Sequence, residues 1–344
     1  MSSRFPITHT LIFLLALVGC QKAKAPEQAV QPATNQSPAA SGSNVFGAFG
    51  NQAPADTSLT ESKEPVRITR KIRPDGEGNL LIAAFTDVFR YDGTGYAKLP
   101  KPPGLPSFDA FDALEDSQGN VWVASTHFGV YRYDGEAFTH FTTANGLAHN
   151  RTMDLYEDRQ GHIWIATMGG ACRYDGQAFQ NFTRKEGLAD DDVNVIIEDS
   201  KGTFWFGTRG ATSMFDPDAD TFTEVKSTSG GSLINIRTIM EDREGAIWLG
   251  GNDGIWRVRE DQPVPISTKG ANHLYEDSEG DIWFTAGSSL FIITQESLSQ
   301  EQPEATELVT DQGMFFGISE DQAGAIWVGT LQGVLVFDKE EITR

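Results

Sequence analysis

Pairs of adjacent acidic residues are the feature of this sequence whose types and spacing most suggest chemistry. Two neighbouring carboxylates can share a proton or hold a cation. The same Glu-Asp pair returns six times, however, so we interpret it as architecture, with the acids serving as turn caps and solvated strand ends. The pairs are Glu115-Asp116, Glu157-Asp158, Glu198-Asp199, Glu241-Asp242, Glu276-Asp277 and Glu320-Asp321.

A run of three aspartates, Asp190 to Asp192, does not repeat, and three carboxylates could bind a hard cation. The run lacks the spacing and the glycine of an EF-hand loop, which favours a solvated acidic loop. No histidine pair has zinc-site spacing such as HExxH, although a site dispersed along the chain stays open. We expect Cys172 to be a small buried hydrophobic residue, and we expect no metal, no cofactor and no catalytic residue. The histidines considered are His127, His140, His149, His162 and His273.

The balance of charges bounds the class of partner. The 344 residues include 27 Lys and Arg against 48 Asp and Glu, a net charge of −21 with neutral histidines. Nucleic-acid binding depends on Lys and Arg at phosphates, so we expect no nucleic-acid partner. The 35 glycines are about a tenth of the chain, above the usual ~7%. Such a content favours many tight turns and hence many short strands.

The first nineteen residues form a predicted signal peptide. Leu11 to Val18 is an apolar run too short to span a ~30 Å hydrocarbon layer. The residues Leu17 to Cys20 resemble the lipobox of bacterial lipoproteins, which implies that Cys20 is lipidated and begins the mature chain. The resemblance implies a lipid-anchored protein of the bacterial cell envelope, and Gln21 leaves sorting to the outer membrane open. An ordinary cleaved signal and a chance apolar start are the alternatives.

Residues 20–64 are predicted to be a disordered tether. They are rich in Ala, Pro, Gln, Ser and Asn and show no periodicity, so they bury too little apolar surface to offset the entropy of ordering. Val45, Phe46 and Phe49 interrupt the segment. They are an incidental hydrophobic cluster, a docking segment, or a patch that folds back on the domain.

The chain from residue 65 to residue 344 repeats one unit seven times. The pattern Asp-x-x-Gly-x-x-Trp recurs every 35 to 44 residues, in the range of propeller blades. A first copy, Asp75/Gly78/Leu81, has Leu in the Trp position. The six copies with Trp are Asp116/Gly119/Trp122, Asp158/Gly161/Trp164, Asp199/Gly202/Trp205, Asp242/Gly245/Trp248, Asp277/Gly280/Trp283 and Asp321/Gly324/Trp327.

Within each copy apolar and polar residues alternate, which predicts strands. In the third copy we expect strands at residues 153–157, 163–167, 172–174 and 179–182. Two positions beyond each Trp the residue is small, which allows neighbouring sheets to approach closely. We therefore predict an all-β fold, a seven-bladed β-propeller with four-stranded blades. Pro263 and Pro265 fit only an edge strand.

Closure of the ring is left open by the sequence. Residues 341–343 stand where a fourth strand of the last blade belongs, which would close the ring without strand exchange. Alternatively, Val66 to Ile68 could pair there as an N-terminal clasp.

The third repeat carries a family resemblance. Asn145-Gly146-Leu147, Leu155 to Asp158, Gly161 to Thr167 and Arg173 to Gly176 resemble the two-component regulator propeller repeat. That family forms periplasmic sensing regions of hybrid histidine kinases, as seven-bladed sheets. We find no transmembrane helix after the repeats, no immunoglobulin-like spacer and no kinase, so the resemblance implies binding or sensing and not phosphorylation by this chain.

A ligand site is expected on the face opposite the repeated turns, where the connections differ most between repeats. Mixed aromatic and hydrogen-bonding groups there suit an oligosaccharide-like ligand or a protein loop, although variable loops alone would look similar. The candidate ligand-binding residues are His127, Phe128, His149, Asn150, Arg151, Arg209, Arg237, Asn252, Asp253, His273 and Phe315, with Met168, Asn235 and Met314 beside them.

Two classes of function follow. The leading one is a lipid-anchored, noncatalytic propeller that binds an envelope ligand or protein partner as a sensor or interaction module, a view that depends on fold analogy. The runner-up is an enzyme, because Asp277 to Thr285 also resembles the repeats of streptogramin lyases, propellers that use a histidine, a glutamate and magnesium. Ala286 departs from the acidic residue that often follows there. A pure envelope scaffold is a third alternative.

Overall fold

The computed structural model describes residues 65–259, 262–300, 302–310 and 313–343. The expected signal peptide (residues 1–19), the lipidation site Cys20 and the expected tether to residue 64 lie outside the described residues.

Seven antiparallel sheets follow one another along the chain, and in each sheet the strands pair in chain order. We call them blades 1 to 7. Blade 1 comprises β1 (Thr69–Pro74), β2 (Leu80–Ala84), β3 (Val88–Tyr91) and β4 (Tyr96–Lys98), and blade 2 comprises β5 (Ala110–Glu115), β6 (Val121–Ser125), β7 (Gly129–Tyr133) and β8 (Phe138–Phe141). Blade 3 comprises β9 (Thr152–Glu157), β10 (Ile163–Thr167), β11 (Gly170–Tyr174) and β12 (Phe179–Phe182), and blade 4 comprises β13 (Val193–Glu198), β14 (Phe204–Thr208), β15 (Ser213–Asp216) and β16 (Thr221–Glu224). Blade 5 comprises β17 (Ile236–Glu241), β18 (Ile247–Gly251), β19 (Gly254–Arg259) and β20 (Gln262–Ser267), blade 6 comprises β21 (His273–Glu276), β22 (Ile282–Ala286), β23 (Ser289–Ile293) and β24 (Thr306–Thr310), and blade 7 comprises β25 (Phe315–Glu320), β26 (Ile326–Thr330) and β27 (Gly333–Phe337).

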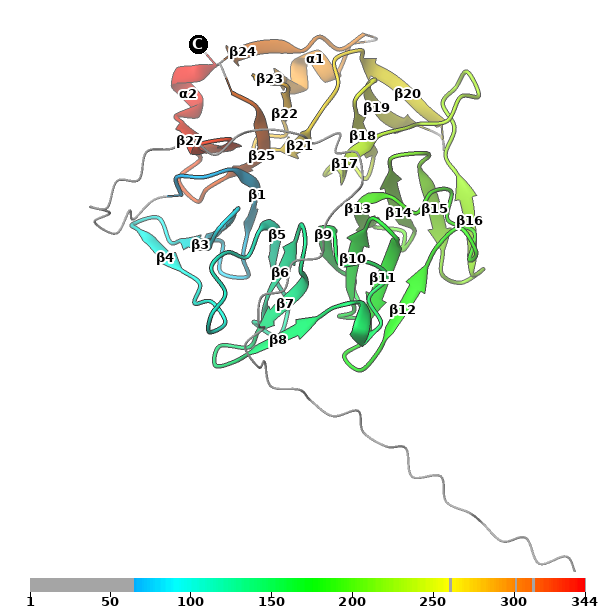
Figure 1. Ribbon diagram of the computed structural model, residues 1–344. Coiled ribbons are helices and arrows are strands. Elements are labelled where there is room, and N and C mark those ends of the chain that lie inside the picture. Colours follow the sequence, from blue (N-terminus) through cyan, green and yellow to red (C-terminus); the bar gives the residue numbers. More distant parts are fainter. Residues whose placement is uncertain (1–64, 260–261, 301, 311–312, 344) are drawn as a thin grey trace, which may run out of the picture. The chain divides into compact units, whose positions relative to one another are not determined.

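The predicted seven-bladed β-propeller is confirmed (Figure 1). The first strand of every blade lies nearest the centre, and the ring closes where β1 packs against β25 and β26. Helical structure among the described residues is limited to short segments, η1 (Thr143–Asn145), α1 (Gln295–Leu298) and α2 (Lys339–Ile342). The outer strand of blade 5, β20, contains Pro263 and Pro265, at the sheet edge where the sequence placed them.

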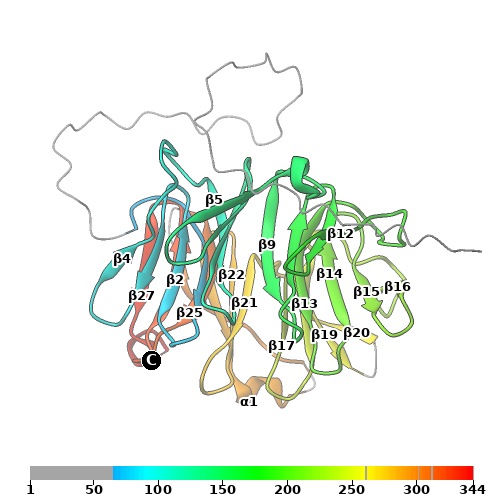
Figure 2. The ribbon, with the colours of Figure 1, turned by 90° about the horizontal axis from the view of Figure 1, so that it is seen from below.

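The two sides of the propeller are set by the connections (Figure 2). We call the side of the Asp-x-x-Gly turns, between first and second strands, the turn face. The loop face carries the connections from second to third strands and from each fourth strand to the next blade. Helix α1 follows the third strand β23 and lies on the turn face, whereas η1 follows the fourth strand β8 and lies on the loop face.

The last blade lacks the fourth strand that the sequence offered at residues 341–343 as one way of closing the ring. Residues 341–343 do not form a strand, because Asp338 caps helix α2 by accepting the N–H groups of Glu340 and Glu341. Blade 7 therefore has three strands within the described residues. Its open edge meets the N-terminal side of the chain, since a β-carbon on Gly333 would collide with the carbonyl oxygen of Pro65.

Three other blades have a glycine at the start of the third strand, where blade 7 has Gly333. In these blades a β-carbon on the glycine would collide with the carbonyl oxygen of the last residue of the fourth strand. The pairs are Gly129 with Phe141, Gly170 with Phe182 and Gly254 with Ser267. Pro65 thus stands where a fourth strand would end in blade 7, directly before the segment that the sequence offered as an alternative clasp. Val66 to Ile68 themselves are not a strand.

The hydrophobic core lies between neighbouring blades. Trp164 of blade 3 is fully buried, and its ring centroid lies 4.6 Å from that of Phe204 and 5.7 Å from that of Phe206 in blade 4. The small residues of the second strands permit this approach. A β-carbon on Gly250 would lie 2.7 Å from Cγ2 of Thr238 and 2.9 Å from Cβ of Ala271 in the next blade. Each blade therefore completes the core of its neighbour.

The aspartate of each repeat joins the turn to this core. In blade 2, Asp116 Oδ1 accepts the N–H groups of Gln118 and Asn120, while Oδ2 accepts the indole N–H of Trp122 at 2.7 Å. The same indole bond recurs at Trp164, Trp205, Trp248, Trp283 and Trp327. One carboxylate therefore satisfies both a turn and a buried donor.

The glycine of each repeat closes the same turn. In blade 4 the φ angle of Gly202 is +87°, in the left-handed region that glycine adopts without strain, and its N–H donates to the carbonyl oxygen of Asp199 at 2.9 Å. Most of these glycines are withdrawn from solvent: Gly161, Gly202, Gly245 and Gly324 are half-buried, and Gly280 is buried. Their shared role is therefore to close the turn. Positive φ and the bond to the aspartate carbonyl are shared by Gly78, Gly119, Gly161, Gly202, Gly245, Gly280 and Gly324.

The glutamate before that aspartate links blades. Glu157 accepts the N–H of Ser117 in the preceding blade at 2.8 Å, and Glu241 does the same for Ser200 at 2.7 Å. Equivalent bonds join Glu115 to Gly76, Glu198 to Arg159, Glu276 to Arg243 and Glu320 to Ser278. The closing interface has Pro74 at this position, and there Gln322 of blade 7 donates to the carbonyl of Glu77 instead. The acidic pairs are thus turn caps and inter-blade ties.

Candidate functional site

A β-bulge near the start of the first strands turns a set of side chains toward the centre of the ring. The register between first and second strands shifts at this point in six blades, which leaves one extra residue in each first strand. In blade 6 the equivalent residue directly precedes β21. We call these seven partly exposed residues the bulge ring: Arg70, Phe111, Met153, Asn194, Arg237, Asn272 and Phe316.

Members of the bulge ring touch the next blade around much of the circle. The Arg70 guanidinium lies 5.0 Å from the ring centroid of Phe111 in blade 2 and 5.6 Å from that of Phe316 in blade 7. Arg237 donates to Oδ1 of Asn272 at 3.0 Å, and Asn272 donates to the carbonyl of Phe315 at 3.0 Å. These contacts connect blades 5, 6, 7, 1 and 2 near the loop face.

A second set lies one residue further along each first strand. We call it the inner ring: Lys71, Asp112, Asp154, Val195, Thr238, His273 and Gly317. Four of its side chains accept a backbone N–H from the next blade and so hold the blades together. The pairs are Asp112 with Leu155, Asp154 with Ile196, Thr238 with Leu274 and His273 with Ile318.

Two cations of blade 1 neutralise the two inner-ring carboxylates. Arg73 donates to both oxygens of Asp112, at 3.0 and 2.5 Å, and to Asp154 at 2.8 Å. Lys71 donates to Asp154 at 3.0 Å. Burial raises the pKa of Asp112 to about 6, against the lowering effect of Arg73 and Lys71. This layer therefore contains equal numbers of positive and negative groups.

The surroundings of His273 keep its ring neutral. Burial, together with nearby Lys71 and Arg73, lowers the pKa of His273 well below its usual value. Its Nδ1 accepts the N–H of Ile318, which requires the tautomer with the proton on Nε2. A neutral imidazole next to two cations is a poor position for a metal cation.

Several residues expected from the sequence gather around Asp192 on the loop face. Arg209 forms an ion pair with Asp192 at 3.3 Å, and the charges of Arg151 and His149 also act on that carboxyl. Burial raises the pKa of Asp192, against the lowering effect of these groups. Arg209 in turn lies close enough to Arg237 to lower its pKa, after the larger effect of burial. This group therefore reaches the bulge ring through Arg237.

The other expected site residues are more scattered. His127 Nδ1 lies 3.2 Å from Oδ2 of Asp109, and the neighbouring Phe128 is 43% exposed. Asn252 and Asp253 are exposed in the turn between β18 and β19. Asn150 has a local role, since its side-chain oxygen accepts the N–H of Thr143.

Phe315 is placed differently from the expectation. It is fully buried among Trp283, Ile318 and Val328, so it cannot contact a ligand on the surface. The partly exposed aromatic residue at this point is its neighbour Phe316, because the bulge in β25 turns that side chain the other way.

The aspartate run and the cysteine have local roles. Asp190 pairs with the guanidinium of Arg184, and Asp191 accepts the N–H of the same residue. Cys172 is fully buried, its Sγ accepts the N–H of Ala148, and burial raises the pKa of the thiol to about 12. The buried Cys172 agrees with the sequence interpretation, whereas the aspartate run is half-buried and paired with arginines and is not a solvated loop.

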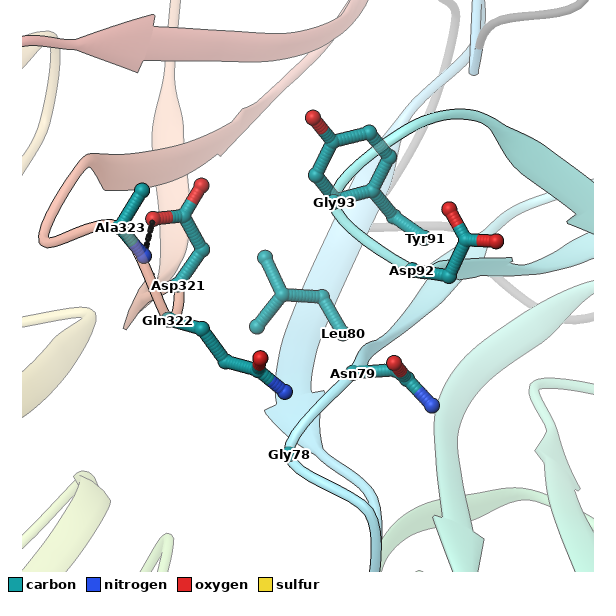
Figure 3. A pocket seen from close by; sticks show the side chains of 9 residues that line it. All are labelled: Gly78, Asn79, Leu80, Tyr91, Asp92, Gly93, Asp321, Gln322 and Ala323. Atoms are coloured by element: carbon teal, nitrogen blue, oxygen red, sulfur yellow. Dashed lines mark hydrogen bonds between the residues drawn. The ribbon is translucent and has the colours of Figure 1, made fainter.

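A small hollow on the turn face lies at the closing interface (Figure 3). It has a volume of about 230 Å³, and turns of blades 1 and 7 line it with Asn79, Leu80, Tyr91 and Gln322 among others. Two carboxylates line it, Asp92 and Asp321, and both oxygens of Asp321 are engaged within its own repeat, by Ala323, Ala325 and the Trp327 indole. The hollow lies at the interface that has Pro74 in place of an inter-blade glutamate, and a second hollow, of about 270 Å³, lies between blades 1 and 2.

Sequence reasoning missed most of the bulge ring and the charged part of the inner ring. The signal was present, because every bulge-ring residue stands eleven positions before the Trp position of its repeat and every inner-ring residue ten before it. Residue type varies widely at both positions while the flanking strand stays apolar. The missed residues are Arg70, Lys71, Arg73, Phe111, Asp112, Met153, Asp154, Asn194, Asn272 and Phe316.

Comparison with known proteins agrees with a β-propeller built from sequence repeats. Residues 146–169, 187–210 and 230–253 match the family model of the two component regulator propeller. The interpretation of these segments as two-component regulator propeller repeats is therefore confirmed. No curated protein matches the sequence.

Solved structures share the fold at low sequence identity. The extracellular domain of a putative hybrid two component system from B. thetaiotaomicron has a TM-score of 0.64 at 20% identity, and the match covers 80% of this chain and 39% of that one. An inactive virginiamycin B lyase from Staphylococcus aureus with quinupristin has a TM-score of 0.62 at 16% identity, over 81% and 96% of the chains. PorZ, a surface component of the type-IX secretion system of Porphyromonas gingivalis, has a TM-score of 0.54 at 17% identity, over 78% and 51%. Across the part of the chain that the structure describes, no helix is long and apolar enough to cross a membrane.

Proposed function

We propose that this propeller is a noncatalytic binding module, a sensor or interaction domain of the bacterial cell envelope, and that it binds a ligand or protein partner on its loop face. One observation carries the proposal. Three of the five large hydrophobic side chains that are exposed among the described residues lie on loop-face connections. These three are Phe128, Ile234 and Met314, whereas Val66 precedes β1 and Val336 lies in β27.

The composition of this face suits recognition. Apolar side chains that remain in water on a folded domain mark interaction surfaces when they occur together. Ile234 is 41% and Met314 40% exposed, and they lie on the connections that lead into the strands carrying Arg237 and Phe316. The similarity to sensor propellers of two-component systems supports a binding role, as an argument by analogy.

A paired set of variants tests the proposal. The purified full chain is titrated with a panel of neutral and acidic oligosaccharides and short peptides, and its melting temperature is recorded. For any probe that binds, Ile234→Ser and Met314→Ser should weaken the affinity, while Val336→Ser, an equally exposed valine in β27, should not. Equal affinity for all three variants would contradict the loop-face assignment, and no binding to the panel would contradict ligand sensing and direct the search to protein partners by crosslinking.

Attachment to the envelope through Cys20 is part of the same proposal. The lipobox resemblance of residues 17–20 supports it. In bacteria fed labelled palmitate, the wild-type chain should carry the label and sediment with membranes, whereas Cys20→Ala should do neither. A labelled Cys20→Ala variant, or an unlabelled wild type, would refute lipidation at this residue.

The lyase alternative has its own assay. It draws support from the structural likeness to virginiamycin B lyase. Within the inner ring the one histidine, His273, lies beside two cations, which disfavours magnesium there. We expect no conversion of quinupristin by the full chain with Mg²⁺, measured by mass spectrometry, and conversion that a chelator stops would replace the binding proposal with the enzyme.

A further inference from the structure

Arg70 is a cation held in an apolar setting. Its guanidinium lies between the aromatic rings of Phe111 and Phe316. Its Nε is buried without a hydrogen-bond partner, and no carboxylate among the described residues pairs with the side chain. Burial lowers the pKa of Arg70, and no acidic group acts to raise it. A partly buried cation without a counter-charge is unfavourable, so an anion at this place would be stabilised.

Arg237, which is exposed, is the second cation of the bulge ring that lacks an acidic partner among the described residues. Its hydrogen bond goes to the amide oxygen of Asn272, a neutral group. Burial and the nearby charge of Arg209 lower its pKa, and no carboxylate within residues 65–259 or the other described ranges offsets this. Arg209 itself is paired with Asp192. The bulge ring thus has two arginines without an acidic partner in a chain whose net charge is −21.

The layer beneath cannot neutralise these two arginines. Asp112 and Asp154 already accept hydrogen bonds from Arg73, and Asp154 also from Lys71. Their remaining acceptor positions hold the backbone N–H groups of Leu155 and Ile196. Among the described residues no carboxylate is therefore left to neutralise Arg70 and Arg237, and a bound anion would supply that counter-charge.

We propose that the bulge ring binds an organic carboxylate, with Arg70 and Arg237 recognising the anionic group and Phe111, Met153 and Phe316 contacting the apolar part of the ligand. A guanidinium presents two parallel donors that match a carboxylate. Aromatic and thioether side chains offer contact area to a flat or apolar body, such as a sugar-acid ring or an aromatic acid. The inference rests on the proposed function and specifies the chemical class of its ligand.

The experiment compares acids with their neutral counterparts. The full chain is titrated with glucuronate oligomers against glucose oligomers, and with phenylacetate against phenylacetamide, by calorimetry at low and high salt. Inorganic phosphate serves as a bare-anion probe. We expect at least one acid to bind and its neutral counterpart to bind at least about tenfold more weakly. High salt should lower the affinity for the acid.

Variants locate the site. Arg70→Gln and Arg237→Gln should each weaken the affinity for the acid about tenfold or more. Because Arg237 is exposed, Arg237→Gln is the variant that disturbs the structure less. Arg70→Lys keeps the charge and loses the paired donors, so it should give an intermediate loss. Arg184→Gln is the matched control, since this exposed loop-face arginine already pairs with Asp190, and it should bind as the wild type does.

Each outcome separates this inference from the function it builds on. A neutral probe that binds on the loop face with equal affinity to the wild type and to Arg70→Gln would keep the binding function and overturn the carboxylate. Phosphate binding that both arginine variants abolish, without any carboxylate binding, would overturn the organic ligand in favour of an inorganic anion. Absence of binding by every acid would overturn the inference.

Discussion

Replacing Asp116 by alanine measures what the buried indole bond of the repeat contributes to stability. Asp116 accepts two turn N–H groups through Oδ1 and the Trp122 indole N–H through Oδ2. Trp122 is only 2% exposed. Blade 1 offers a matched control, because Asp75 holds the same two turn N–H groups but has Leu81 where the other blades have Trp. The second oxygen of Asp75 pairs with Arg90, which is 37% exposed.

The two variants should lose different amounts of stability, because only Asp116→Ala leaves a buried hydrogen-bond donor without an acceptor. Both variants lose two turn bonds, each with a net value of about 0.5–1.5 kcal/mol. Asp116→Ala in addition leaves the Trp122 indole N–H without an acceptor, at a cost of about 1–3 kcal/mol. The ion pair lost in Asp75→Ala is partly exposed and contributes about 0–1 kcal/mol. We therefore expect Asp116→Ala to lower the free energy of unfolding by about 1–2 kcal/mol more than Asp75→Ala does.

Urea and thermal unfolding followed by circular dichroism provide the assay. For a domain of this size 1 kcal/mol corresponds to roughly 2–4 °C in Tm. A Trp122→Phe background keeps an aromatic ring and removes the donor, so there Asp116→Ala should cost no more than Asp75→Ala. Equal losses for the two alanine variants in the wild-type background would refute the reasoning, since the indole bond would then add nothing to the turn.

Three further outcomes follow from the contacts. Glu157→Ala removes two inter-blade bonds, from the N–H and the hydroxyl of Ser117, and because these bonds are exposed we expect a combined loss of about 1 kcal/mol in urea unfolding; no loss would mean that the glutamate does not tie blades. The pKa of Asp112 rises from 3.8 in a free aspartate to about 6 on folding, so its contribution to stability is present at low pH and is lost as the pH rises through 6. The unfolding free energy of the wild type relative to Asp112→Asn should therefore fall, by on the order of 3 kcal/mol, between pH 4 and pH 7, and a flat difference would contradict the shift. Burial raises the pKa of the Cys172 thiol to about 12, so a thiol reagent at pH 8 should label this residue only after unfolding, as read by peptide mass spectrometry.

The sequence by itself determined the architecture. The Asp-x-x-Gly-x-x-Trp pattern sets the phase and number of the blades, and its residues act locally, since Asp158, its turn and Trp164 lie within seven positions of one another. Alternation with period two assigned the strands of blade 3 to within two residues at each end. Local chemistry of this kind is readable because the interacting groups are neighbours along the chain.

Only the tertiary structure decided which residues meet at the centre. Arg70 lies against Phe316 although 246 positions separate them in the chain, and a β-bulge, set by the pairing of two strands, turns both side chains inward. The acidic pairs illustrate the same limit, because the aspartate acts within its own turn whereas the glutamate ties Ser117 to a blade 40 positions further on. One sequence records the repeat but not the closure that brings its first and last copies together. The candidate site depends on that closure, since Arg70 of blade 1 contacts both blade 2 and blade 7.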